Sequence, residues 1–127
     1  MTPGARALVL VVDDDPLIRN LVFAVLEDAR FDLAEATDGE EALRVAAERP
    51  PDVVILDVMM PGMDGNAVCK AMRADARLAG ARIIMLTARS ESFDRDQAME
   101  AGADDFISKP FSPLDLIAAV TSSDRSR

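Results

Sequence analysis

Side chains that can take part in metal or phosphoryl chemistry follow four stretches of this sequence that have the character of strands. Three aspartates follow the first stretch, a fourth aspartate follows another, and a threonine and a lysine follow two later ones. These residues are Asp13–Asp15, Asp57, Thr87 and Lys109. Each of them alone is an ordinary strand-end residue, so their meaning depends on whether the fold brings them together.

Gathered at one place, these residues would form a cation site. Two carboxylates about 5 Å apart repel each other by roughly 3 kcal/mol at an effective dielectric constant of about 20, so a group of three requires a cation. Carboxylate, carbonyl and water oxygens suit Mg²⁺, which often shares its site with a phosphate. A carboxylate can also act as a nucleophile and form an aspartyl phosphate, with Lys109 and Thr87 supplying a positive charge and a hydrogen-bond donor.

The composition excludes several other chemistries. There is no histidine and only one cysteine, Cys69, which removes catalytic imidazole, a disulfide framework and a cysteine-based zinc site. A net charge of −9 and a pI near 4.4 argue against direct binding of nucleic acid by this domain. We expect a soluble cytoplasmic protein, because Met1–Gly4 carries no signal pattern and the apolar runs are too short to cross a bilayer.

Short apolar runs without polar alternation predict strands that are covered on both faces. The clear runs are Ala7–Val12, Val53–Leu56 and Ile83–Leu86, and weaker ones lie at Leu33–Ala36 and Asp105–Ile107.

Helical patterns lie between these strands and begin at capping residues. The predicted starts are Asp15-Pro16, Asp38 with Glu41, Asp64-Gly65, Glu91 and Ser112-Pro113. Pro50-Pro51 cannot continue the second helix, and Gly102 is a natural residue after the end of the fourth.

Five successive pairs of strand and helix predict an α/β fold. Right-handed crossovers turn such a chain into a parallel sheet with helices on both faces. The length of 127 residues fits one domain, which we place at residues 1–120, followed by a polar tail at 121–127. Ligands of these folds bind beyond the carboxyl ends of the strands, where Asp13, Asp57, Thr87 and Lys109 would meet.

Four segments of the chain resemble the receiver domains of two-component response regulators, the family of the chemotaxis regulator. They are Val11–Pro16, Leu56–Gly65, Leu86–Ala88 and Lys109–Phe111, and they occur in the family's order at the predicted strand ends. The resemblance covers roughly residues 7–120. It implies a flavodoxin-like (βα)5 fold with a five-stranded parallel sheet of order 2-1-3-4-5.

The resemblance implies a phosphoryl-accepting site that depends on Mg²⁺. Asp57 would be the phosphoacceptor, and Asp14 and Asp57 would hold Mg²⁺ together with the backbone carbonyl of Met59. Asp13 would assist through a water molecule. Lys109 would pair with the acyl phosphate.

Three more residues take roles by the same resemblance. Thr87 would donate its hydroxyl to a phosphoryl oxygen, and Ala88 would leave room for the phosphoryl group and offer its N–H. Phe106 matches the aromatic switch position and would turn inward when Thr87 moves toward the phosphate. The Lys109–Pro110 peptide is expected to be cis, which would aim the lysine into the site.

The resemblance also implies partners. A sensor histidine kinase or a phosphotransfer protein would donate the phosphoryl group. An output domain or downstream protein would bind the face made by the last two helices and the strand between them. The chain would phosphorylate and dephosphorylate itself as a switch, without being a turnover enzyme, and could form a phosphorylation-linked dimer. Many receivers that dimerise to drive winged-helix DNA binding carry a basic residue where this chain has Ala119, so the sequence disfavours that subclass of receivers. Arg89 should influence the lifetime of the phosphate.

Several residues near the site have simpler interpretations. Asp15 and Asp64 are expected to cap helices, and Asp104-Asp105 to be solvated charge. The methionines that follow Asp57 are expected to pack against the protein, because thioether sulfur is a poor ligand for Mg²⁺. These methionines are Met59, Met60 and Met63.

Three other functions fit parts of the pattern. A haloacid-dehalogenase-like phosphatase would use Asp13 as its nucleophile, but Leu17 stands where Thr or Val is expected and Lys109 follows the late acidic pair instead of preceding it. A flavin carrier needs a Ser/Thr/Gly-rich phosphate loop, and the carboxylates here would repel the phosphate. A phosphorylation-independent interaction module would not need the complete set of acids, Thr87 and Lys109.

Overall fold

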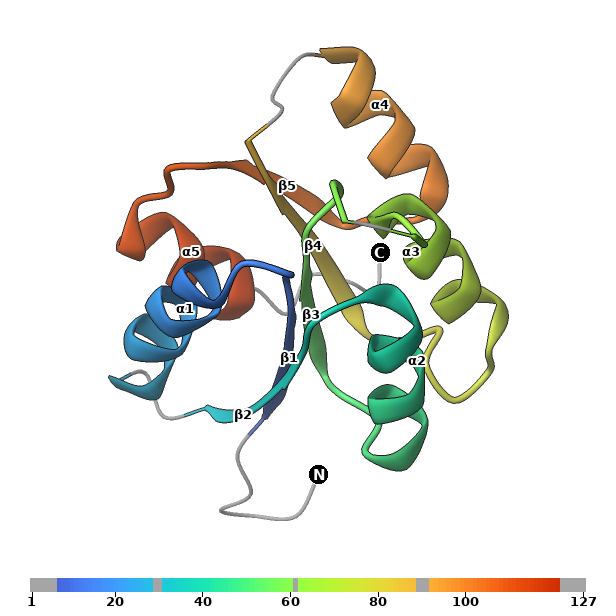
Figure 1. Ribbon diagram of the computed structural model, residues 1–127, viewed down its shortest axis with the longest axis horizontal. Helices are drawn as coiled ribbons and strands as arrows, with labels where there is room; N and C mark the ends of the chain where they lie inside the picture. The colour runs from blue at the N-terminus through green and yellow to red at the C-terminus, as the bar shows by residue number, and fades with distance from the viewer. Residues whose placement is uncertain (1–6, 29–30, 61, 89–91, 122–127) are drawn as a thin grey trace.

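The computed structural model describes residues 7–28, 31–60, 62–88 and 92–121, and in them strands and helices alternate along the chain (Figure 1). The strands are β1 Leu8–Val12, β2 Asp32–Ala36, β3 Val53–Leu56, β4 Arg82–Thr87 and β5 Asp105–Ser108. The helices are α1 Pro16–Asp28, α2 Gly39–Glu48, α3 Gly65–Ala74, α4 Ser92–Ala101 and α5 Pro113–Thr121. All the predicted elements are present. Thr121, which we placed in the polar tail, is the last residue of α5. Met1–Gly4, Arg89, Glu91 and residues 122–127 lie outside the described residues.

The sheet is parallel throughout, with the strand order β2-β1-β3-β4-β5. This confirms the predicted flavodoxin-like order. The connections after β1 and β3 leave in opposite directions, so a crevice opens between the carboxyl ends of these two strands. Leu56 at the end of β3 pairs with Val12 of β1 on one side and with Met85 of β4 on the other. The residues that follow β1 and β3 therefore emerge side by side at one edge of the sheet.

Helices cover both faces of the sheet, with α1 and α5 on one face and α2, α3 and α4 on the other (Figure 1). Successive strand residues point to opposite faces. Leu10 and Val12 of β1 join the core beneath α2, α3 and α4, whereas Val9 and Val11 join the core beneath α1 and α5. Burial on both faces explains why the strand sequences are continuously apolar. Cys69 is buried on α3.

Side-chain caps begin the helices at the predicted positions. The carboxylates of Asp15, Asp38 and Asp64 each accept a hydrogen bond from a backbone N–H of the following turn, at 2.8 or 2.9 Å. Glu41 completes the start of α2 by accepting hydrogen bonds from the backbone N–H and the hydroxyl of Thr37, and these bonds lower the pKa of Glu41. Within the described residues, no helix combines the length and the apolar character needed to cross a membrane.

Candidate metal and phosphoryl site

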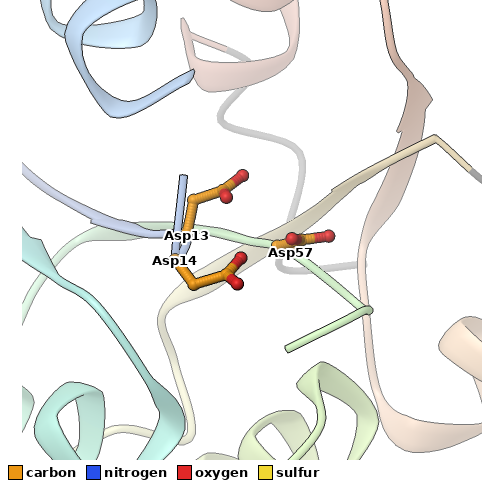
Figure 2. A group of neighbouring side chains, drawn as sticks. All are labelled: Asp13, Asp14 and Asp57. Atoms are coloured by element: carbon orange, nitrogen blue, oxygen red, sulfur yellow. The ribbon is translucent and has the colours of Figure 1, made fainter. Parts of the chain in front are cut away.

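Three carboxylates meet at the crevice between β1 and β3 (Figure 2). Asp13 and Asp14 follow β1, Asp57 follows β3, and one oxygen of each lies within 4.8 Å of the others. Asp13 and Asp57 are buried, and Asp14 is exposed. The structure thus brings together the acidic residues that the sequence placed at neighbouring strand ends, and it leaves one of them open to solvent.

Backbone hydrogen bonds hold the two buried aspartates in place. The N–H of Asp57 donates to the carbonyl of Val12 at 2.9 Å, and the N–H of Asp13 donates to the carbonyl of Ala36 at 3.2 Å. These bonds extend the sheet one residue beyond β1 and β3. At Gly65, the first residue of α3, a Cβ would lie 2.3 Å from the carbonyl oxygen of Asp57. Only glycine lets α3 begin this close to the acidic site.

Lys109 reaches into the cluster from the loop after β5. Its ammonium nitrogen lies 2.9 Å from Asp13 Oδ2 and 3.6 Å from Asp57 Oδ2. Its backbone N–H donates to the carbonyl of Thr87 at 2.8 Å, which ties the loop to the end of β4. The Lys109–Pro110 peptide is cis, as expected. The ammonium of Lys109 therefore lies between two buried carboxylates.

The other predicted site residues are arranged around this cluster. Thr87 is fully buried at the end of β4, and Ala88 follows it at the surface. The backbone N–H of Met59 donates to Asp57 Oδ1 at 3.1 Å. The side chain of Met59 is 52% exposed, so the prediction that it packs was wrong. Met60 is buried and Met63 packs against the core, as predicted.

The side chain of Phe106 on β5 is buried in this structure. It is 7% exposed and belongs to the core beneath α2, α3 and α4. The guanidinium carbon of Arg95 on α4 lies 6.0 Å from the centre of its ring, within the range of a cation–π contact. Phe106 is thus a buried residue of β5, and Arg95 links it to α4.

The acidic surroundings make Asp57 hard to ionise. Burial raises the pKa of the Asp57 carboxyl to about 6, and the charges of Asp13 and Asp14 act in the same direction. The ammonium of Lys109 and the N–H of Met59 oppose this rise in pKa without cancelling it. The site therefore favours either a proton on Asp57 or a further cation beside it.

The donor set fits Mg²⁺. It offers carboxylate oxygens at both buried and exposed positions, with neither imidazole nor thiolate among them. Mg²⁺ retains several waters and needs few protein ligands, so an open site with the exposed Asp14 at its rim suits it. Zinc would require nitrogen or sulfur donors, which the described cluster lacks.

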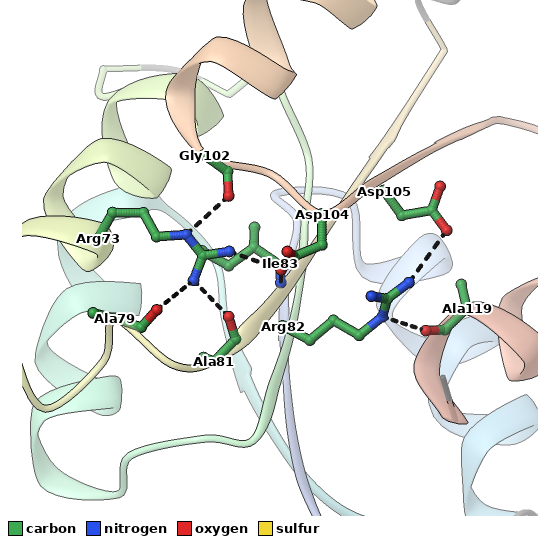
Figure 3. A network of polar contacts seen from close by, with 9 residues as sticks. All are labelled: Arg73, Ala79, Ala81, Arg82, Ile83, Gly102, Asp104, Asp105 and Ala119. Atoms are coloured by element: carbon green, nitrogen blue, oxygen red, sulfur yellow. Dashed lines mark hydrogen bonds and ion pairs between the residues drawn. The ribbon is translucent and has the colours of Figure 1, made fainter. Parts of the chain in front are cut away.

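Asp104 and Asp105 contradict the prediction that they are solvated charge (Figure 3). Asp104 Oδ2 accepts hydrogen bonds from Arg73 Nη2 at 2.7 Å and from the N–H of Ile83 at 2.8 Å. Asp105 lies 3.5 Å from the guanidinium of Arg82. Arg73 also donates to three backbone carbonyls, those of Ala79, Ala81 and Gly102. These arginines are distant in sequence, so local pattern gave no sign of the pairing.

Arg19 on α1 was not predicted to belong to the site. Its Nη1 donates to the carbonyl oxygen of Asp13 at 2.7 Å, and its Nε donates to Glu35 Oε1 on β2 at 2.9 Å. One signal was available in the sequence, because a cation near the amino-terminal end of a helix opposes the helix dipole. An arginine at this position is favoured by a hydrogen-bond acceptor nearby, and the residues after β1 were the nearest in sequence that could supply one.

The strand order and the acidic crevice are those of a flavodoxin-like signalling fold. The family model described as response regulator receiver domain matches residues 9–121. The DNA-binding response regulator MtrA of Mycolicibacterium smegmatis is 45% identical over 115 residues, which cover 91% of this chain and 49% of that protein. The alkaline phosphatase synthesis transcriptional regulatory protein PhoP of Bacillus subtilis is 46% identical over 112 residues, covering 88% of this chain and 46% of PhoP.

Solved structures agree with these relatives. The chemotaxis protein CheY4 of Vibrio cholerae matches with a TM-score of 0.85 and 37% identity, over 91% of this chain and 99% of CheY4. The BeF3-activated DrrB receiver domain matches with a TM-score of 0.83 and 33% identity, over 91% of this chain and 95% of that domain. The chain belongs to the receiver domain family of response regulators, the phosphorylation-dependent switches of two-component signalling. It spans about half the length of the curated relatives it matches.

Proposed function

We propose that Asp57 accepts a phosphoryl group from a phosphohistidine of a sensor histidine kinase or phosphotransfer protein, in a reaction that requires Mg²⁺. An oxygen of Asp57 attacks phosphorus, the O–P bond forms as the P–N bond breaks, and the imidazole leaves. The geometry around the two buried aspartates supports Asp57 over Asp13 as the nucleophile. Both oxygens of Asp13 accept hydrogen bonds at 2.9 Å, one from the N–H of Asp15 and one from Lys109. Among the described residues, Asp57 Oδ2 has the longer 3.6 Å ion pair with Lys109.

The metal would be held by Asp14, Asp57 and the backbone carbonyl of Met59, with Asp13 acting through a water molecule. When bound, Mg²⁺ would offset the negative charge of the phosphoryl oxygens and of the carboxylates around them. Two features support this assignment. The exposure of Asp14 allows the ion to enter, and the raised pKa of the buried Asp57 carboxyl means that a cation beside it would favour its ionised form.

Lys109, Thr87 and Ala88 would bind the transferred group. Lys109 already lies between Asp13 and Asp57, so a small movement of its ammonium would pair it with a phosphoryl oxygen. The hydroxyl of Thr87 and the N–H of Ala88 would donate to the other oxygens. The 2.8 Å hydrogen bond between the backbones of Lys109 and Thr87 supports joint action by these two residues.

An apolar surface beside the site suits the phosphoryl donor. Leu17 and Leu21 on α1 and Leu114 on α5 are exposed. A pocket that Lys109 helps to line continues this surface. Its other lining residues are Ile18, Leu21, Val25, Pro110, Phe111 and Pro113. We propose that an apolar helix face of the donor protein packs here, which would bring its phosphohistidine to Asp57.

The output would leave through the face formed by α4, β5 and α5. Movement of Thr87 toward the phosphate would alter the packing of Phe106, and Phe106 contacts α4 through Arg95. An output domain or a downstream protein would read this face, and a phosphorylation-linked dimer could form through it. The relatives MtrA and PhoP are about twice as long as their match to this chain. MtrA is a DNA-binding response regulator, which runs against the expectation from Ala119. The net charge of −9 argues against direct DNA contact by this domain, so a DNA-binding output would be carried by a separate region.

Intact-mass measurement after incubation with acetyl phosphate and Mg²⁺ tests this function. The wild-type protein should gain the mass of one phosphoryl group, and Asp57→Asn should not. A phosphoryl mass that persists in Asp57→Asn would refute the assignment of Asp57. The phosphatase alternative predicts steady turnover of a generic aryl phosphate, whereas the receiver assignment predicts no steady turnover of that substrate.

A further inference from the structure

We propose that Arg19 is a positioning residue for the metal site, and that Glu35 holds it in place. Arg19 would fix the peptide between Asp13 and Asp14, so that the Asp14 carboxylate faces Asp57. This inference rests on the Mg²⁺ site proposed above and assigns it a supporting residue outside the acidic cluster.

Arg19 connects three elements at the edge of the crevice. It lies on α1, its Nη1 donates to the Asp13 carbonyl at 2.7 Å, and its Nε donates to Glu35 of β2 at 2.9 Å. The Arg19 side chain is only 14% exposed, whereas that of Glu35 is 52% exposed. The guanidinium uses two separate edges for two partners, which an ammonium group cannot do with the same geometry.

The carbonyl that Arg19 binds belongs to the peptide that leads directly to Asp14. The other polar groups of Asp13 are already held, since its N–H donates to Ala36 and its carboxylate accepts from Asp15 and Lys109. Within the described part of the chain, no hydrogen bond reaches the exposed Asp14 carboxylate. The direction of the Asp14 side chain therefore depends on its backbone, and Arg19 holds the carbonyl end of that peptide.

A positioning role and a purely electrostatic role predict opposite signs. Arg19 is a cation next to the proposed Mg²⁺ ligands, so by charge alone its removal should strengthen the binding of a divalent cation. If Arg19 instead orients the ligands, its removal should weaken binding despite the loss of a positive charge. Groups that orient metal ligands typically change metal affinity by about ten to a hundredfold when removed.

Mg²⁺ titrations followed by the backbone NMR resonances of Asp13, Asp14 and Asp57 distinguish these roles. We expect the dissociation constant of Arg19→Met to rise about tenfold, and that of Arg19→Lys to rise although the charge is kept. The matched control is Arg77→Met, which removes an exposed arginine paired with Asp75 beyond the carboxyl end of α3. Its Mg²⁺ affinity should stay within about twofold of the wild-type value.

A second variant tests the same role if Arg19→Met does not fold. Glu35→Gln removes only the exposed anchor of Arg19, and it should weaken Mg²⁺ binding in the wild-type background but not in Arg19→Met. If Arg19→Met folds and binds Mg²⁺ as tightly as the wild type or more tightly, the positioning role is overturned. If Arg19→Met does not fold, an unchanged Mg²⁺ affinity in Glu35→Gln overturns it instead. Failure of the wild-type protein itself to bind Mg²⁺ would instead refute the proposed function, and the inference with it.

Discussion

Replacing Asp57 with asparagine should stabilise the metal-free protein above pH 6. The structure raises the pKa of Asp57 from 3.8 to about 6, chiefly because the carboxyl is buried and lies beside Asp13. A raised pKa means that the folded state binds the proton more tightly than the unfolded state does. The free energy of unfolding therefore falls as the pH rises from about 4 through 6.

The expected size follows from this difference in pKa. About two pKa units correspond to about 3 kcal/mol, which is the upper limit of the penalty that ionised Asp57 imposes on the fold at pH 8. The Asp57→Asn variant has no ionisable group at this position and carries no such penalty. Its advantage in unfolding free energy over the wild type should thus grow from near zero at pH 4 to about 2 to 3 kcal/mol at pH 8.

Urea unfolding followed by circular dichroism measures this effect, because the chain has neither Trp nor Tyr to report by fluorescence. The experiment is done in EDTA across the pH range and repeated with Mg²⁺. Mg²⁺ at about tenfold excess over its dissociation constant should stabilise the wild-type protein by about 1.4 kcal/mol and Asp57→Asn by much less. An advantage of Asp57→Asn in EDTA that is the same at pH 4 and pH 8 would refute the link between the buried charge and stability.

Three further substitutions test other parts of the structure. Gly65→Ala should destabilise the fold by about 2 kcal/mol in urea unfolding and slow phosphorylation, because its Cβ would press on the carbonyl of Asp57. An unchanged free energy of unfolding together with an unchanged phosphorylation rate would contradict the close contact. Arg73→Met should lower the free energy of unfolding by about 3 kcal/mol, because it removes the arginine that pairs with Asp104 at 2.7 Å. A loss below about 1 kcal/mol would show that the network contributes little. Lys109→Met should raise the pKa of Asp57 above its value of about 6, as measured by carboxyl ¹³C NMR, and a lower pKa would contradict the placement of the ammonium.

The fold was predictable because its strands are buried on both faces. Val53–Leu56 is entirely apolar, and such a run followed by a capped helix has few alternatives to a strand of a parallel sheet. The site followed from the fold, since parallel strands bring Asp13 and Asp57 to the same edge. Aspartate caps such as Asp38 and Asp64 are local in sequence and were also predictable.

Interactions between distant segments were not predictable. Asp104, in the loop before β5, looked like solvated charge because its partner Arg73 lies 31 residues away on α3. Arg19 gave only an indirect signal, because its partners are a backbone carbonyl and a carboxylate on β2. The burial of Phe106 depends on how α4 packs against β5, which residue types alone do not determine.

The most direct test of the central claim identifies the residue that carries the phosphoryl group. Borohydride reduces an aspartyl phosphate to homoserine, so reduction after treatment with acetyl phosphate and Mg²⁺ leaves a permanent mark that peptide sequencing by mass spectrometry can locate. We expect homoserine at position 57 alone, and none when EDTA replaces Mg²⁺. Homoserine in place of Asp13 or Asp14, or an equal yield at position 57 without metal, would contradict the proposed site.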